Sequence, residues 1–187
     1  LWISQAEGSL VSEDYVWDYV SDEQRTAINS LAYRIDRMKD RKGRRCYEVV
    51  VRRVATRFML QQAFNWADEV YIMAHGEAER KSLEKWDYRV AVARLPAGAW
   101  ENRRDWIQPI VTPGARAKHV VLATCYAGLA PDQLGEGVSV KSHPSRARVR
   151  SNDVAKWSLE QLRQVKAPPS AEGNEWPRRI AIMLGPE

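Results

Sequence analysis

The chain has 187 residues, of which 44% are hydrophobic and 28% are charged. These proportions are typical of a globular protein and exclude the disordered, collagen-like and coiled-coil classes. Lysine and arginine (29 residues) exceed aspartate and glutamate (24), and the net charge of +5 is spread over several clusters, so it supports an acidic partner only weakly. We expect one domain over residues 1–187. Because Leu1 stands where an initiator methionine would, we expect an excised piece of a larger protein or a mature start.

Helices and strands are expected to alternate in the first half of the chain. A short apolar run predicts a strand at residues 1–4. Ser21 and Gln24 form an N-cap pattern ahead of apolar residues at helical spacing, which predicts a helix that ends near Met38. Residues 47–67 contain no proline or glycine and predict a second, longer helix. A run of β-forming residues at 69–74 then predicts a strand that is buried on both faces.

The second half repeats this alternation. The residue patterns predict a short strand at 88–93, a helical piece at 101–110, a turn at 112–115, a buried strand at 119–124, a helix at 153–165 and a last strand at 179–184. Asn152 or Asp153 is expected to cap the helix at 153–165. The order of elements predicts an α/β fold with a mostly parallel sheet and helices on both faces.

Two reactive side chains follow two of the predicted buried strands. The strand at 69–74 ends in His75 and Gly76, and the strand at 119–124 ends in Cys125. Ligand crevices in open parallel sheets lie beyond the carboxyl ends of the strands, so an imidazole and a thiol would share one edge if these strands are neighbours. His75 would then serve as the base that a cysteine nucleophile needs, and the backbone N–H groups of Gly76 and Cys125 would hold an oxyanion.

This arrangement resembles the caspase-like cysteine peptidases, which place a His-Gly after one core strand and a cysteine after the next. Caspases carry the histidine about 50 residues before the cysteine, and His75 precedes Cys125 by 50 residues. Here Gly128 stands three residues after Cys125, a spacing closer to the CHAT and metacaspase branch than to true caspases. In this family an acidic residue beyond the first strand prepares the S1 pocket for arginine or lysine. The resemblance assigns that role to Glu7, with Asp132 as the competing candidate.

The function that the resemblance implies is a cysteine endopeptidase that acts through an acyl-enzyme on a protein or peptide substrate, with regulation by other domains or a partner. The alternative is a non-catalytic interaction module of the same fold whose basic loops, at residues 39–45 and 141–150, bind an acidic protein or nucleic acid. Within the second loop, His143 is expected to face solvent. For the peptidase we expect no nucleic-acid or membrane partner.

The remaining sequence signals are negative. No nucleotide-binding, zincin or serine-hydrolase motif occurs, and we expect neither a cofactor nor a metal. The apolar stretch at residues 120–130 is far shorter than the roughly 20 residues that cross a bilayer. Two cysteines form no disulfide framework, which favours a cytoplasmic location. Cys46 has arginines beside it but no strand-end setting, so it is the poorer nucleophile candidate.

Overall fold

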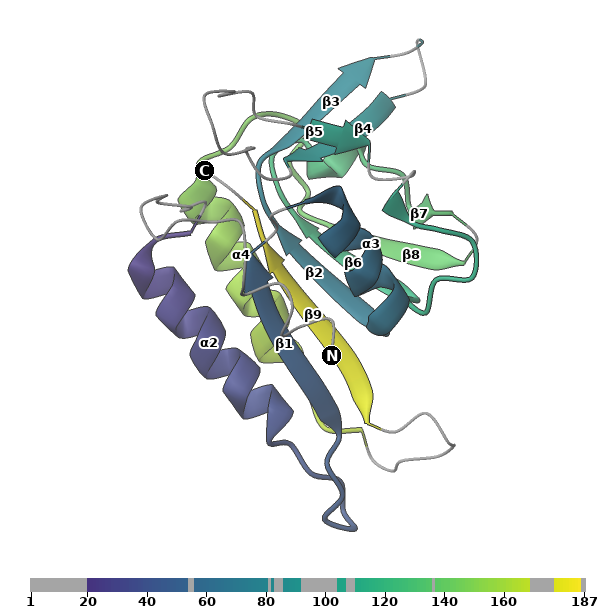
Figure 1. Ribbon diagram of the computed structural model, residues 1–187. Helices are drawn as coiled ribbons and strands as arrows, with labels where there is room; N and C mark the ends of the chain where they lie inside the picture. The colour runs from purple at the N-terminus through teal and green to yellow at the C-terminus, as the bar shows by residue number, and fades with distance from the viewer. Residues whose placement is uncertain are drawn as a thin grey trace.

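The computed structural model describes residues 20–53, 56–80, 82, 86–91, 104–106, 110–135, 137–168 and 177–185. Over these residues the fold is α/β, with a six-stranded sheet, helices on both of its faces and a separate three-stranded antiparallel sheet (Figure 1). The strand expected at residues 1–4 lies outside the described residues.

The large sheet is parallel in all but one of its pairings, as the sequence predicts. Its spatial order is β1 (Tyr47–Arg53), β9 (Arg178–Leu184), β2 (Glu69–Met73), β6 (His119–Ala123), β8 (Val138–Ser142) and β7 (Gln133–Leu134). Only β7 runs antiparallel to its neighbour. β9 is last in the sequence of strands but lies between β1 and β2, and it is buried from Ile180 onward.

Each helix buries one apolar stripe against this sheet, and the helices are divided between its two faces. α2 (Asp22–Asp36) and α4 (Ser151–Gln164) pack on one face, where Ile28 and Leu162 join a buried cluster with alternate residues of β2, β6 and β9. α3 (Arg57–Trp66) packs on the other face through Leu60 and Phe64. Figure 1 shows this division into layers. None of the described helices is long and apolar enough to cross a membrane.

The prediction of a helix at residues 47–67 is wrong for the first part of this range. Residues Tyr47–Arg53 form β1, and the helix begins only after Thr56, whose side chain accepts a hydrogen bond from the Met59 N–H. Val50 packs on the α3 side of the sheet, whereas Val49 and Val51 pack on the α2 side, so the valines follow the twofold period of a strand. Pairing along the whole of β9 outweighs the weak helical pattern.

The N-termini of the two longer helices differ from each other. Ser21 caps α2 in a full capping box with Gln24, as predicted. α4 begins earlier than expected, with Arg150 at the N-cap and no capping side chain. Asn152 therefore lies inside the first turn, where it accepts a hydrogen bond from Gln24 at 2.6 Å and joins the two helices.

The small antiparallel sheet begins directly after His75. It consists of β3 (Gly76–Arg80), β4 (Trp86–Ala91) and β5 (Arg104–Trp106), in that order. β4 corresponds to the short strand expected at 88–93. The prediction of a helical piece at residues 101–110 is wrong, because Arg104–Trp106 is a strand that pairs with β4. A small sheet thus extends from the edge at which the predicted site lies.

Candidate functional site

The structure brings the backbones of His75 and Cys125 to one edge of the sheet. β2 and β6 are adjacent and parallel, and their register ends with Met73 opposite Ala123. The Ala74 N–H continues the pairing by donating to the Ala123 carbonyl at 3.4 Å. His75 and Cys125 each follow the last paired residue by two positions, so they leave the sheet side by side.

Gly76 is held against the backbone of Cys125. A Cβ atom at Gly76 would lie 2.3 Å from the Cys125 carbonyl oxygen, 2.7 Å from Thr124 Oγ1 and 2.8 Å from the Tyr88 hydroxyl. Real Cβ atoms do not approach other atoms so closely, so only glycine fits. The glycine of the predicted His-Gly motif is therefore required by the contact between the two strand ends.

Two buried hydroxyl groups that the sequence analysis missed support this contact. The hydroxyls of Tyr88, on β4, and Thr124 are hydrogen-bonded to each other, and Thr124 Oγ1 donates to the Cys125 carbonyl at 3.0 Å. Both residues are fully buried. A threonine directly before the cysteine was visible in the sequence, but its partner Tyr88 comes from the small sheet, and nothing in the sequence pairs them.

The loop after Cys125 turns sharply. Tyr126 has a φ of 57°, a left-handed conformation that non-glycine residues seldom adopt. A short 3-10 helix, η2 (Ala127–Leu129), follows it. A Cβ atom at Gly128 would lie 2.5 Å from the Pro144 carbonyl oxygen, so the glycine allows the loop to pack against the chain beyond β8.

Residues 145–149, which we call the covering segment, lie along this loop. The Gly128 N–H donates to the Ser145 carbonyl at 2.8 Å, and the Tyr126 N–H donates to the Ala147 carbonyl at 3.2 Å. At the far end, Cys125 Sγ donates to the Val149 carbonyl at 3.4 Å and accepts from the Val149 N–H at 3.5 Å. Cys125 is consequently only 5% exposed.

His143 is half-buried, whereas the sequence led us to expect it to face solvent. Its N–H donates to the Leu122 carbonyl at 2.9 Å, and its ring lies edge-on to Trp157 of α4 at a centroid distance of 5.5 Å. Nδ1 accepts from the Ser145 N–H at 3.2 Å. Burial lowers the pKa of His143, against an opposing effect of the Asp153 charge. The covering segment is thus anchored at its start by a half-buried imidazole.

The structure does not bring Asp132 to this edge. Its carbonyl accepts from the Val140 N–H, and Val140 pairs with Val120 near the start of β6, whereas Cys125 follows the end of β6. β8 also separates Asp132 from β6. The pairing of β7 with β8, which the sequence did not indicate, accounts for this difference. Glu7 lies outside the described residues.

Cys46 is a poor candidate for a nucleophile in the structure as well. It is fully buried beside α2, and burial raises the pKa of its thiol, with the Asp40 charge acting in the same direction and Arg44 against them. Among the described residues, no three or more histidine, cysteine, aspartate or glutamate side chains gather into a group that could hold a metal ion.

No family model, curated protein or solved structure matches this chain.

Proposed function

We propose that this chain is a cysteine endopeptidase of the caspase-like type, nearest to the CHAT and metacaspase branch, with His75 and Cys125 as its catalytic dyad. The observation that carries the proposal is the register of β2 and β6, which places the backbones of these two residues beside each other at the carboxyl edge of the sheet. This edge is where open parallel sheets bind their ligands.

The chemistry follows from the two side chains and two backbone groups. His75 accepts the thiol proton, and Cys125 Sγ attacks the carbonyl carbon of the peptide bond to form a tetrahedral intermediate. The N–H groups of Gly76 and Cys125 donate to the oxyanion. His75 then protonates the leaving amine, and water attacks the acyl-enzyme to release the second product and restore the thiol. If Glu7 lines the S1 pocket, the enzyme cleaves after arginine or lysine.

Regulation is part of the proposal because of the covering segment. Both hydrogen-bonding atoms of the Val149 backbone are directed at Cys125 Sγ, and the thiol is almost fully buried. A substrate carbonyl reaches the sulfur only after residues 145–149 move away. Other domains, a partner or cleavage at the exposed Arg146 or Arg148 would supply that displacement.

The test is alkylation of the intact protein by iodoacetamide across a range of pH, read by mass. The parent protein is compared with His75→Ala, Cys125→Ala and Cys46→Ala. Once the covering segment is displaced, we expect one fast-reacting thiol, which persists in Cys46→Ala, disappears in Cys125→Ala and slows in His75→Ala. A Cys125 that reacts equally fast without His75, in protein shown to be folded and with the covering segment displaced, would exclude the dyad.

A second candidate is the non-catalytic interaction module. It is favoured by the burial of Cys125, since a buried thiol bonded on both sides is usually inert. Arg146, Arg148 and Arg150 are exposed and would bind an acidic protein or nucleic acid. Binding of this kind weakens steeply with added salt, so a salt series with an acidic ligand separates this candidate from the peptidase.

A further inference from the structure

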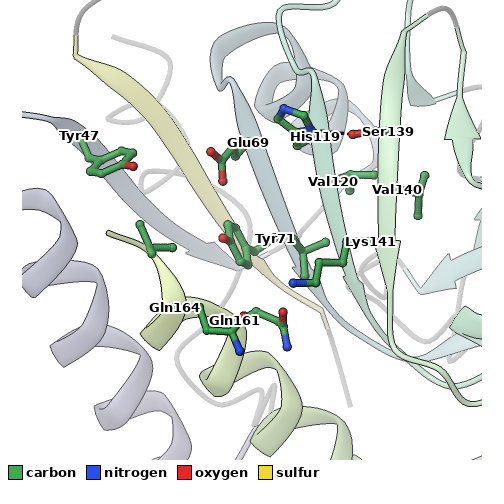
Figure 2. A pocket seen from close by; sticks show the side chains of 12 residues that line it. Tyr47, Glu69, Tyr71, His119, Val120, Ser139, Val140, Lys141, Gln161 and Gln164 are labelled. Carbon is green, nitrogen blue, oxygen red and sulfur yellow. Dashed lines mark hydrogen bonds between the residues drawn. The ribbon is translucent and has the colours of Figure 1, made fainter. Parts of the chain in front are cut away.

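A cavity of about 410 Å³ lies far from Cys125, on the α4 face of the sheet. It is lined by residues at the beginnings of β1, β2, β6 and β8 and by the last turn of α4 (Figure 2). Its volume falls in the range of small-molecule sites, about 300–1,000 Å³.

One wall is a row of polar residues in register across three strands. Glu69 pairs with His119, and His119 pairs with Ser139. His119 Nδ1 and Ser139 Oγ are 2.6 Å apart, and Ser139 Oγ donates to the Lys118 carbonyl at 3.1 Å. Because Ser139 donates its hydroxyl proton to that carbonyl, His119 Nδ1 is the donor in the hydrogen bond to Ser139 Oγ.

A second wall combines a carboxylate with two phenol rings. Figure 2 shows the Glu69 carboxylate turned away from His119, toward the side of the cavity where Tyr47 and Tyr71 lie. Burial raises the pKa of both tyrosines, and the charge of Glu69 raises them further, whereas Arg178 opposes this effect at Tyr47. Both rings therefore stay neutral. A carboxylate beside neutral aromatic rings is the environment that favours an organic ammonium group.

The remaining walls supply an unused acceptor and a cation. Gln161 is 8% exposed. Its Nε2 donates to the Trp157 carbonyl at 3.4 Å, so the other atom of the side-chain amide is Oε1, an acceptor. Oε1 is buried and has no donor among the described residues. Lys141 is exposed, and Figure 2 shows it extending from β8 toward Tyr71 and Gln161. Within the described part of the chain, neither Glu69 nor Lys141 forms an ion pair.

We propose that this cavity binds a small zwitterion of the amino-acid class. The ligand's ammonium group lies against Glu69 and the tyrosine rings, and its carboxylate is held by Lys141. Glu69 and the buried Gln161 Oε1 offer acceptors, and Lys141 is the one ammonium among the described lining residues, so an amine or an acid alone satisfies only part of the lining. The site is separate from the proposed peptidase chemistry and does not depend on it.

The test uses isothermal titration of the full chain with three zwitterions of increasing length, glycine, 4-aminobutyrate and 6-aminohexanoate. We expect at least one to bind with a dissociation constant below about 10 mM, and its parent amine and parent acid to bind at least about tenfold more weakly. Glu69→Gln and Lys141→Gln should each weaken binding about tenfold. The matched control is Glu48→Gln on β1, because Glu48 pairs with Arg179 at 3.4 Å and does not line the cavity.

Three outcomes would overturn the proposal. The first is that none of the three zwitterions saturates the protein below about 10 mM, and the second is that the parent amine or acid binds as tightly as the zwitterion. The third is that Glu69→Gln binds the zwitterion no more weakly than Glu48→Gln does. Circular dichroism of each variant verifies that a loss of binding is not a loss of folding. Cys125→Ala should bind normally, so failure of the peptidase proposal leaves this result unaffected.

Discussion

Gly76 is the residue whose replacement most directly tests the contact between the two strand ends. A Cβ atom there would collide with the backbone carbonyl of Cys125, which cannot move without shifting β6. We expect Gly76→Ala to lower the free energy of unfolding by about 1–3 kcal/mol, as other overpacked positions do. The measurement is urea denaturation followed by tryptophan fluorescence.

The control for this substitution is Gly43→Ala. Gly43 has a φ of 77°, but no atom lies within 4 Å of the position that a Cβ would take, so the substitution costs only the strain of the backbone conformation, about 1–2 kcal/mol. Gly43→Ala should leave the alkylation rate of Cys125 unchanged, whereas Gly76→Ala should alter it. Equal alkylation rates in both variants would contradict the close packing of Gly76 on Cys125.

His143 predicts how stability depends on pH. Burial lowers its pKa in the folded state, so the unfolded chain binds the proton first as the pH falls through the ordinary value of about 6.5. The stability that the neutral imidazole contributes is complete above that pH and decreases below it. We expect the parent to lose more stability than His143→Gln between about pH 7.5 and about pH 5.5, measured by urea denaturation. An equal loss in the two proteins would contradict the assignment.

At the scale of the elements, the covering segment provides a prediction about access to the thiol. Ser145 Oγ donates to the Ala147 carbonyl at 3.0 Å and accepts from the Ala147 N–H at 3.2 Å, and these bonds hold the segment in its turn. We expect Ser145→Ala to loosen the segment and raise the alkylation rate of Cys125 several-fold, roughly the effect of 1 kcal/mol. The rate is read by intact mass.

Ser30→Ala is the matched control, since Ser30 is exposed on α2 and remote from the segment. Cys125 in the Ser30→Ala variant should be alkylated at the parent rate. If Ser145→Ala also reacts at the parent rate, the covering segment does not limit access to Cys125.

Elements with strong local signals were predicted from the sequence. α2 has a capping box and a regular apolar spacing, and β2, β6 and β9 are compact apolar runs that end at polar or turn residues. β1 was mistaken for a helix because a half-buried strand and a helix share apolar residues over a short stretch. The pairing with β9, which is more than a hundred residues away in sequence, decides between them.

For the whole molecule, β9 is predicted to be the strand on which the sheet depends. Ile182 is fully buried between the layers, and it pairs with the half-buried Val51 on the edge strand β1. We expect Ile182→Ala to lower the free energy of unfolding by about 2–5 kcal/mol, because it leaves a cavity in the core. Val51→Ala should cost about 1 kcal/mol, since less apolar area is lost from a site already half exposed.

Both changes in the free energy of unfolding are to be measured by denaturant unfolding, with one m-value fitted to both variants. If the two substitutions cost the same, the sheet depends no more on β9 than on the edge strand β1.

The class of the fold, most of its elements and the two reactive side chains at the strand ends can be predicted from local sequence patterns. These features depend on local periodicity, capping and the residues that end each strand, all of which can be seen within a short window. The His-Gly and Cys residues were therefore identifiable before their positions in space were known.

Which strands are neighbours, and therefore which residues meet, depends on pairing between distant segments of the chain. Pairing of β2 with β6 places the backbone of His75 beside that of Cys125, and pairing of β7 with β8 keeps Asp132 away from them. The return of the chain after β8 covers the thiol. The row of Glu69, His119 and Ser139 arises in the same way. Contacts of this kind join segments far apart in sequence, and no local pattern encodes the partner of a strand because the backbone hydrogen-bonding groups of all strands are alike.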